Sequence, residues 1–413
     1  MKEDKKILLK KLSEFLGQKE FGEFQKLLLK ENSSKKQKVF SSTLSEEKQL
    51  SVEFSSPLDF YSNIDLLITF VSEKLTYKNL TKLLLFIGED LTAKGSLDSA
   101  QKVFFHLLYL SQDKSSNNKV KAKALFGLGD IYSRQAFWEK SISYLNKARI
   151  IFKSINDKYG MAKCENILGT IKVEIGELKS AKKHFESALA FLDVRKSGVL
   201  SGMLESNIGI MENIQGNYNQ AYIHFQKALH KFEKDNNHQR LSEVHHNLGM
   251  VYLEKKNYKS GIKEFDRAFT HARKADVWQI MCISCVNKAF IYSKLKDYSL
   301  ANAFAIKAMD IAYKINDRLS IADIYKIKGV IEKNKRNYTL SENYLNTSLR
   351  INTELKNILN QAEALNEMGF LYKKMKDFKK SRSCFNKSLA KYRYLKIDKK
   401  VEEILKELKF IKD

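Results

Sequence analysis

Small and bulky residues recur along most of this chain with a period of 40 residues. A small residue opens each copy, and a second small residue, a bulky residue and a third small residue follow it by 12, 16 and 19 positions. The first column is Gly129, Gly169, Gly209, Gly249, Ala289, Gly329 and Gly369. The bulky column is Leu145, Phe185, Phe225, Phe265, Leu345 and Phe385, with Ala305 as the exception. An interval that holds over seven copies predicts a repeat architecture.

Each copy has the pattern of two helices joined by a tight turn. Glycine or an Asn-Tyr or Asp-Tyr pair supplies the turn in most copies, and an aromatic residue usually follows it. The small residues are expected to let helices approach closely, while the bulky residue fills the gap between neighbouring pairs. An earlier copy, one residue out of phase, contains Gly88 and Phe104. Because no pair buries both faces alone, we expect about eight helix-turn-helix repeats stacked in a solenoid.

Composition supports an all-α fold and predicts a compartment. The 413 residues include one proline, Pro57, and helices exclude proline from their interiors. No apolar stretch approaches the ~18 residues that span a membrane, and the apolar stretch after the first lysines is too short for a signal peptide. Four cysteines are too few for a disulfide framework in a chain of this length. We therefore expect a cytoplasmic protein with buried structural thiols.

The repeats resemble a known family. Residues 247–268, with the sequence NLGMVYLEKKNYKSGIKEFDRA, look like a tetratricopeptide repeat, and so do residues 207–228 and 167–188. The resemblance covers residues 82–395 and, with its 40-residue units, is similar to the long-helix variants of kinesin light chains, spindle-orientation adaptors and bacterial peptide-sensing regulators. It implies a right-handed superhelical solenoid. It also implies that the first helices of the pairs line a concave groove, in which asparagines hold the backbone of a ligand.

The flanking segments differ from the repeat array, which we place at residues 80–396. Residues 1–30 predict an amphipathic helical segment that docks on the solenoid or a partner. The alternative for residues 1–16 is contact with a membrane surface, which a basic polar face suits. Residues 31–57 contain eight serines and predict a flexible linker, residues 58–79 a lead-in helix, and residues 397–413 a capping helix for the exposed end of the array.

Two columns of the first helices predict a partner-binding groove. An amide side chain both donates to and accepts from a peptide unit, which suits the asparagines to that role. The polar candidates are Asn166, Asn207, Asn213, Asn247, Asn287, Asn366 and His246. The apolar candidates are Ile210, Met250, Phe290 and Phe370. The alternatives are an asparagine ladder that ties helices together and apolar packing between repeats.

Positive charge is concentrated near the carboxyl end of a chain whose net charge is +25. Residues 373–400 hold twelve basic residues against two acidic ones. The candidate basic patch is Lys373, Lys374, Lys376, Lys379, Lys380 and Arg382. Such a patch suits an acidic protein partner, with nucleic acid less favoured, or it reflects a lysine-rich composition that solvates the surface.

The sequence contains few residues with the spacing of a catalytic or metal-binding motif. Cys282 and Cys285 have a CxxC spacing without a second pair to complete a zinc site, and His184 and His224 recur at the 40-residue interval as a packing or surface column. The sequence therefore predicts no enzyme, cofactor or metal. It predicts a protein–protein interaction scaffold or adaptor whose groove binds a peptide or helix to assemble a complex, for example a bacterial envelope or motility machine. The alternative is a regulator whose amino-terminal helical module is an effector controlled by a groove ligand.

Overall fold

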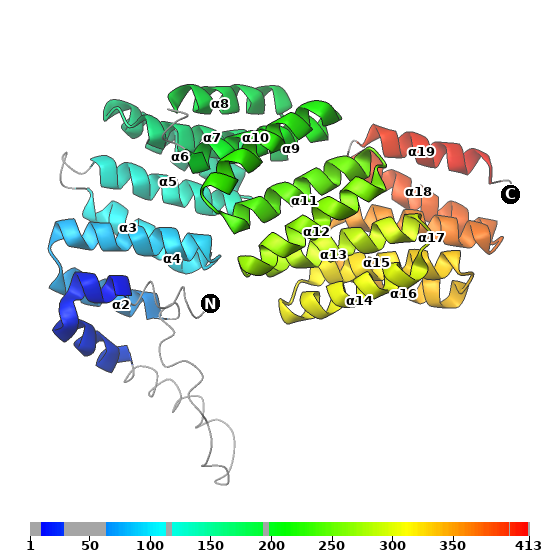
Figure 1. The fold of residues 1–413 in the computed structure, drawn as a ribbon, viewed down its shortest axis with the longest axis horizontal. Coiled ribbons are helices and arrows are strands. Elements are labelled where there is room, and N and C mark those ends of the chain that lie inside the picture. Colours follow the sequence, from blue (N-terminus) through cyan, green and yellow to red (C-terminus); the bar gives the residue numbers. More distant parts are fainter. Residues whose placement is uncertain (1–9, 29–62, 113–117, 193–197, 396, 412–413) are drawn as a thin grey trace, which may run out of the picture. The chain divides into compact units, whose positions relative to one another are not determined.

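The structure is a computed structural model that describes residues 10–28, 63–112, 118–192, 198–395 and 397–411. The predicted linker at residues 31–57 lies outside them. The regular elements of the described residues are all helices, and the fold is an all-α helical-repeat solenoid (Figure 1). The chain divides into two compact units, residues 1–197 and residues 198–413.

The first unit contains the helical residues 10–28 and seven labelled helices. These are α2 (Ile64–Lys74), α3 (Tyr77–Ala93), α4 (Leu97–Leu110), α5 (Asn118–Arg134), α6 (Trp138–Ser154), α7 (Lys158–Glu174) and α8 (Leu178–Phe191). Helices α3 to α8 form three antiparallel pairs. The predicted lead-in helix is shorter than expected on its carboxyl side, because α2 ends at Lys74 and α3 begins at Tyr77 as the first helix of a repeat.

The second unit contains five pairs and a final helix. Its first helices are α9 (Gly198–Ile214), α11 (His238–Glu254), α13 (Trp278–Lys294), α15 (Arg318–Asn334) and α17 (Ile358–Lys374). Its second helices are α10 (Tyr218–Lys234), α12 (Tyr258–Lys274), α14 (Tyr298–Lys314), α16 (Tyr338–Glu354) and α18 (Phe378–Tyr394), and the chain closes with α19 (Asp398–Lys409).

Asx residues start several of these helices at the predicted interval. The side chains of Asn237, Asn257 and Asp297 each accept a hydrogen bond from the backbone N–H three residues ahead. Asp317, Asn357 and Asp377 do the same in later repeats. These N-caps satisfy backbone donors that a helix start leaves without partners, so they help to fix where these six helices begin.

The bulky column packs inside each pair, against the small residue that opens the repeat, whereas the sequence placed it between neighbouring pairs. Phe104 of the earlier copy does both, since a Cβ atom placed on Gly127 of the next pair would lie 2.4 Å from its Cζ atom. A Cβ atom placed on Gly209 would lie 2.8 Å from Phe225 Cε1, in the second helix of the same repeat. The same holds for Gly249 with Phe265 and for Gly369 with Phe385. The glycine is therefore the socket for the bulky side chain that follows it by 16 positions. In the exceptional repeat, alanine replaces both the glycine and the bulky residue, and Ala289 and Ala305 are both buried.

Serine at the second small column adds a hydrogen bond to this contact. Ser141 Oγ donates to the carbonyl oxygen of Gly129 over 2.7 Å, and Ser341 and Ser381 donate to Gly329 and Gly369 over 2.8 and 2.9 Å. The serine is completely buried in each case. The bond satisfies the buried hydroxyl without widening the gap between the helices, so serine serves here as well as alanine.

The helical residues 10–28 pack onto the first unit through their apolar face. Leu12, Leu16 and Phe24 are buried in one cluster with residues of α2, α3 and α4. The ring centroids of Phe24 and Phe70 lie 5.2 Å apart, and Lys74 Nζ lies 3.3 Å from Glu23 Oε2. These contacts favour docking on the repeats over the membrane-surface alternative, because the apolar residues from Leu12 to Leu16 that would enter lipid are covered by the protein. Residues 1–9 lie outside the described residues.

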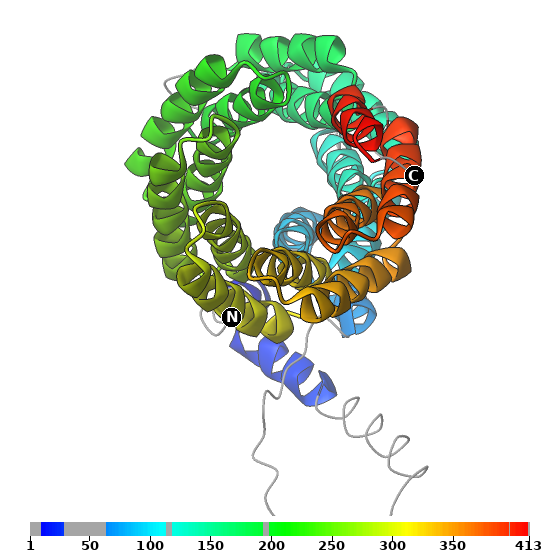
Figure 2. The ribbon, with the colours of Figure 1, turned by 90° about the vertical axis from the view of Figure 1, so that its right-hand side faces the viewer.

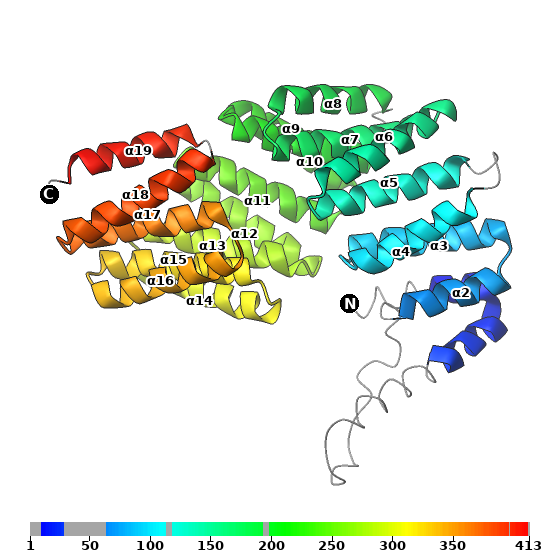
Figure 3. The ribbon, with the colours of Figure 1, turned by 180° about the vertical axis from the view of Figure 1, so that it is seen from behind.

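Helix α19 covers the last repeat. It packs on α18, as Figure 3 shows, and buries Ile404 together with Ile411 beyond its end. Arg382 donates a hydrogen bond to the carbonyl oxygen of Ile411 over 2.6 Å, which fixes the chain end to α18. Leu405 of the same helix lies on its exposed side.

The first helices of the second unit form the inner side of a curve. In Figure 2 the helices coloured green to red form an inner and an outer layer. The first helices contact one another in sequence, α9 with α11, α11 with α13, α13 with α15 and α15 with α17. Side chains on this inner layer are thus brought together from several repeats, which is the arrangement a groove requires.

Two other expectations concern the thiols and the membrane. All four cysteines are buried, as predicted, and burial raises the pKa of Cys282 and of Cys285 to about 11. Within the described residues, none of the helices combines the length and apolarity that a membrane crossing needs.

Candidate functional site

The inner helices of the second unit line two pockets, and both contain residues predicted for the groove. The first pocket, of about 230 Å³, lies over α9 and α11 and includes Asn207, Asn247, Ile210 and His246. The second, of about 290 Å³, lies over α13, α15 and α17 and includes Asn287, Phe290 and Asn366. The predicted asparagine column is therefore divided between two sites.

The first pocket combines an apolar floor with a polar rim. The floor is formed by Met203, Ile210, Phe232 and Ile280. The rim is formed by Ser206, Asn207, Arg240, Glu243 and Asn247. Arg240 Nη1 donates to Glu243 Oε2 over 2.7 Å, so these two charges largely neutralise each other. The pocket is suited to an apolar side chain whose backbone lies against the two asparagines.

His246 sits beside this pocket as a neutral base. Its ring lies 5.5 Å from that of Phe265, and burial lowers its pKa to about 4. The Nδ1 atom is buried and, in the described part of the chain, has no hydrogen-bond partner. A buried imidazole nitrogen without a partner is costly unless a ligand or water satisfies it, so His246 has hydrogen-bonding capacity that the fold itself does not use.

The second pocket is more strongly charged than the first. Apolar contacts come from Val286, Phe290, Ile327, Val330 and Tyr392. The polar lining comes from Asn287, Ser293, Lys294, Asp323, Lys326, Glu363, Asn366, Glu367 and Lys400. Equal numbers of cationic and anionic side chains line it, so it offers matched charges to a ligand and not a field of one sign. The Oδ1 atom of Asn366 is buried and lacks a partner among the described residues.

Lys326 links two carboxylates at the base of this pocket. Its Nζ lies 3.1 Å from Asp323 Oδ1 and also contacts Glu363 of the next repeat. Burial opposes the charged form of Lys326, but the two carboxylates outweigh it and hold its pKa above the ordinary value. Lys333 similarly contacts Glu367 in the next first helix, and this contact lowers the Glu367 pKa against the effect of burial. These pairs join α15 to α17 and fix the pocket wall.

The remaining groove candidates lie apart from the two pockets. Asn166 is buried on α7 of the first unit. Asn213 is on α9, with its Oδ1 atom buried and without a partner in the described residues. Met250 Sδ accepts a hydrogen bond from Asn287 Nδ2 over 3.5 Å, and Phe370 packs on Phe385 with centroids 5.1 Å apart. Met250 and Phe370 thus make the contacts within and between repeats that the packing alternative expected.

The predicted basic patch lies around the turn from α17 to α18. Lys373 Nζ lies 2.6 Å from Glu407 Oε2, and Lys380 Nζ lies 3.6 Å from Asp377 Oδ2. Lys374 Nζ donates to Asn334 Oδ1 over 3.1 Å. Lys376 and Lys379 are exposed. Part of the patch therefore holds the last helices together, and part of it faces solvent.

Sequence reasoning missed the charged residues of both pockets, although a signal was present. Glu243, Asp323 and Glu363 occupy one column of the first helices, six residues before the conserved small position of each repeat pattern. Charged residues usually mark a solvated face, so this column does not stand out in the sequence as part of a binding site. Its position, four residues before the asparagine column, places it on the same side of the helix.

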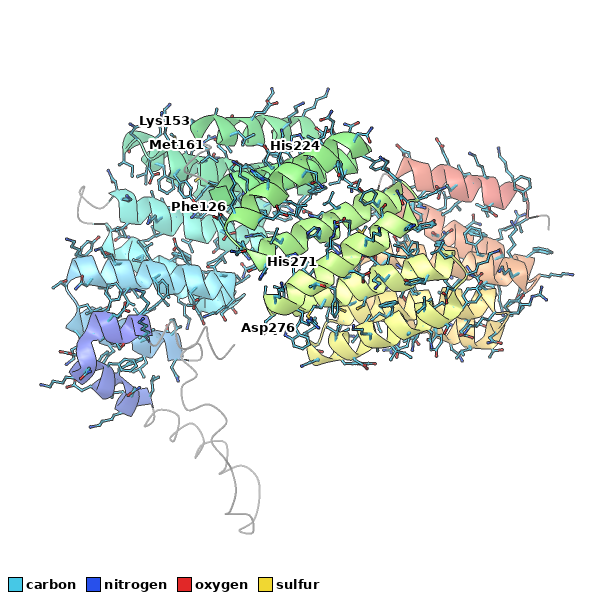
Figure 4. The ribbon with its side chains drawn as sticks, viewed as in Figure 1. Phe126, Lys153, Met161, His224, His271 and Asp276 are labelled. Carbon is cyan, nitrogen blue, oxygen red and sulfur yellow. The ribbon has the colours of Figure 1, made fainter. Side chains whose placement is uncertain are left out.

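Three repeats also contain a histidine–glutamate pair between their two helices. His184 Nδ1 lies 2.6 Å from Glu165 Oε2, His224 Nδ1 lies 2.7 Å from Glu205 Oε2, and His245 Nδ1 lies 2.7 Å from Glu264 Oε2. His224 on α10 and His271 on α12 are labelled in Figure 4. The third pair exchanges the two positions, with histidine on the first helix. These pairs occupy one packing column, which agrees with the structural interpretation of His184 and His224. No cluster of three metal-binding side chains occurs in the described residues.

Family models match three stretches of the chain. Residues 120–193 and 200–274 match a model described as tetratricopeptide repeat, and residues 362–390 match a second model with the same description. The two helical pairs between residues 274 and 362 keep the same 40-residue register, with Ala289 in one pair and Gly329 in the other at the small position. The chain contains tetratricopeptide repeats.

Solved structures share the fold of this tetratricopeptide repeat protein at low sequence identity. The apo form of the quorum sensor NprR from B. thuringiensis has a TM-score of 0.63 and 14% identity, covering 90% of this chain and 97% of that chain. Aspartyl phosphate phosphatase F from Bacillus subtilis has a TM-score of 0.57 and 14% identity, covering 93% of each chain. The Rap conjugation gene regulator of the plasmid pLS20, in complex with the Phr* peptide, has a TM-score of 0.56 and 17% identity, covering 82% of this chain and 95% of that chain.

A curated relative matches a short part of this tetratricopeptide repeat protein. The type II methyltransferase M.CeqI of Rhodococcus hoagii is 27% identical over 117 residues, which is 28% of this chain. The chain spans about a fifth of that relative, 22% of its length. The match is too short to transfer that enzyme's activity.

Proposed function

We propose that this tetratricopeptide repeat protein is a non-enzymatic scaffold whose inner helices in the second unit bind a peptide or a helix of another protein. The observation that carries the proposal is the first pocket, where Asn207 and Asn247 from successive repeats stand beside an apolar floor. Two amides at adjacent repeats suit the backbone of an extended or helical ligand, and the floor suits one apolar side chain. The Phr* complex of a Rap regulator supports a peptide as the ligand class.

A rigid receptor makes this mode of binding efficient. The pocket walls are held by helix pairs, glycine sockets and buried ion pairs, so few groups of the receptor lose conformational freedom when a ligand binds. The ordering cost then falls mainly on the ligand, and several weak contacts along the inner helices add up to useful affinity. In its more specific form, the proposal is that the scaffold assembles a larger complex, such as an envelope or motility machine.

A peptide selection tests the site without knowledge of the natural partner. Peptides are selected from a random phage-displayed library against the full chain, and their affinities are then compared with a variant in which Asn207, Asn247 and Asn287 are replaced by alanine. We expect the variant to bind the selected peptides at least about tenfold more weakly, since each of the three lost polar contacts contributes about 0.5 kcal/mol or more.

A matched control replaces three asparagines on the second helices, Asn302, Asn346 and Asn386, which are exposed. This control should bind like the parent chain, and both variants should keep the parent melting temperature. Selected peptides that bind all three proteins equally would show that the asparagine column is not the binding site.

The second candidate function is a regulator whose amino-terminal module responds to the groove ligand. The helical residues 10–28 and α2 share one core with α3 and α4, which couples the module mechanically to the first repeat. Hydrogen exchange with and without a selected peptide distinguishes the two functions. A regulator shows altered exchange in residues 10–28 and α2 when the peptide is bound, whereas a scaffold shows changes confined to the helices that line the pockets.

A further inference from the structure

Turns in the second unit differ in the residue that adopts the left-handed backbone conformation. After the second helices α10, α12, α14 and α16, the residues with positive φ are Asn236, Asp276, Asn316 and Lys356. Asn and Asp are the side chains that tolerate this conformation best after glycine. After the first helices α11, α13, α15 and α17, the corresponding residues are Lys256, Lys296, Arg336 and Lys376, with φ values of 56°, 63°, 68° and 63°. Four basic residues in succession thus occupy positions where the backbone favours other residue types.

General causes of surface lysine do not account for this difference. A cation near a helix carboxyl end is favoured by the helix dipole, but both kinds of turn follow such an end. A lysine-rich composition would likewise affect both kinds. In nine-residue stretches centred on these positions, the turns after the first helices hold thirteen basic and four acidic residues, and the turns after the second helices hold seven and five. The excess positive charge is placed on one kind of turn.

These four turns share one edge of the second unit, here called the basic edge and defined as residues 252–260, 292–300, 332–340 and 372–380. The first helices contact one another in sequence and run in the same direction, so their carboxyl ends lie along the same edge. Asp276, which Figure 4 labels at the end of α12, marks the opposite edge. Burial and the nearby cations Lys333 and Arg336 lower the pKa of Lys374, so charges of successive repeats act on one another.

The cations at the centre of each turn are available to a partner. Lys256, Lys296, Arg336 and Lys376 are all exposed. In the part of the chain that the structure describes, no carboxylate forms a salt bridge with any of these four. Each turn also contains one acidic residue, Glu254, Asp297, Glu332 or Asp377. A continuous phosphate backbone would meet repulsion at each of these acids, whereas a protein segment can place its own residues between them.

Apolar side chains accompany the cations on the basic edge. Leu295 and Met375, each directly before a positive-φ residue, are 50% and 39% exposed, and Phe378 is 44% exposed. Leu300 and Leu340 are similarly exposed at the start of α14 and α16. Aliphatic groups add nothing to contacts with nucleic-acid phosphates, but they match a protein segment that alternates acidic and apolar residues.

We propose that the basic edge binds an acidic, amphipathic segment of a partner protein. Carboxylates of the segment pair with the four central cations, and its apolar residues pack on Leu295, Met375 and Phe378. The basic edge meets the second pocket at Ser293 and Lys294, but the four central cations and the three apolar residues line neither pocket. The protein therefore presents separate contacts for a groove ligand and for an acidic partner. A scaffold that holds two ligands at once gains effective concentration for whatever reaction joins them.

The test uses the full chain and a variant with Lys256→Asn, Lys296→Asn, Arg336→Asn and Lys376→Asn. Asparagine adopts positive φ readily, so the variant keeps the turns and its melting temperature does not fall. The matched control carries the same change of charge on the opposite edge, with Lys234, Lys274, Lys314 and Lys356 replaced by asparagine. The probe is a fluorescein-labelled 20-residue peptide of glutamate and leucine with helical amphipathic spacing, and binding is followed by fluorescence anisotropy.

We expect the basic-edge variant to bind this peptide about tenfold more weakly, since four exposed ion pairs contribute about 0.4 kcal/mol each. The control variant should stay within about twofold of the parent. A peptide with glutamine in place of glutamate should not bind, and the triple asparagine variant of the groove should bind like the parent. Equal weakening in both four-site variants, or no weakening in either, overturns the proposal. If a 20-base-pair DNA duplex binds the basic edge more tightly than the peptide does, the proposal that the partner is a protein is wrong.

Discussion

Phe185 occupies the space that a side chain on Gly169 would need. A Cβ atom built at Gly169 would lie 2.5 Å from Phe185 Cε1, a distance that real contacts do not reach. The two residues belong to the two helices of one repeat, so the glycine sets how closely the helices approach. The same relationship recurs through the array and gives the first prediction.

Replacing Gly169 by alanine should destabilise the protein by about 2 kcal/mol, because the ring has to move from a well-packed position. The measurement is the free energy of unfolding in urea. Gly22→Ala is the control, since nothing lies within 4 Å of a Cβ at that position. Phe185→Ala should cost less in the Gly169→Ala background than in the parent chain, as the combination of Ala289 with Ala305 suggests. Additive costs in this double-mutant cycle would contradict the socket interpretation.

Lys326→Met should destabilise the protein by about 3 kcal/mol or more at neutral pH, because Asp323 and Glu363 would lose the cation that compensates them. Adding Asp323→Asn and Glu363→Gln to Lys326→Met should recover most of the loss. Lys335→Met is the control, since its pair with Glu332 is exposed and spans 3.4 Å. A Lys326 variant as stable as the control would show that the buried pairs contribute nothing to the wall of the second pocket.

Stability should fall between pH 7 and pH 5 in a way that His246 governs. Its pKa is about 4 in the folded protein and near 6.5 in the unfolded chain. In this range the unfolded chain binds a proton that the folded protein does not, so the free energy of unfolding decreases as the pH falls, by about 2 kcal/mol at pH 5 from this group alone.

Urea unfolding of the parent and of His246→Gln at both pH values measures this contribution. The difference between the two pH values cancels any loss of packing in the variant, and we expect it to be smaller in the variant by that amount. His271, whose pKa burial and two neighbouring histidines lower to about 4, adds a loss in the same direction that remains in the variant. An unchanged pH difference would place His246 in contact with solvent in the folded state.

Phe24→Ala should destabilise the first unit by about 3–4 kcal/mol, because the side chain is fully buried against Phe70 and its removal leaves a cavity. Hydrogen exchange that rises in α2 and α3 identifies the affected unit. Replacement of Leu27, which is exposed on the same helical segment, is the control. If residues 10–28 did not contribute to the core of the first unit, the substitutions of Phe24 and Leu27 would have equally small effects on its stability.

Repeat number, helix pairing and turn position could be derived from the sequence, because they depend on local residue types that recur in register. Glycine and a bulky residue 16 positions later are visible without a structure. The sequence does not show which glycine each bulky residue contacts, since Phe225 could reach a glycine in its own repeat or in the next. The distance between helix axes decides this, and that distance depends on all the contacts of the stack.

The candidate site was harder to derive for a related reason. Asn207 and Asn247 do lie in one pocket, as a shared column suggests, but Asn287 lines the next pocket and donates a hydrogen bond to Met250. Lys326 and its carboxylates were missed because a charged residue in a sequence carries no sign that it is buried. Only the partner from the following repeat makes its burial favourable, and that pairing is a property of the stack.

The glycine that opens a repeat and the bulky side chain that packs on it lie within one hairpin, which has a consequence for how such a chain can change length. If 40 residues were excised between equivalent positions, each glycine that opens a repeat would keep a bulky side chain 16 positions later to fill the space beside it, and no void would be created there inside a hairpin. Only the faces where two hairpins meet would need to be compatible. Whole 40-residue units can therefore be gained or lost without disturbing the packing inside the others. The spacing of the asparagine side chains along the inner helices is then preserved.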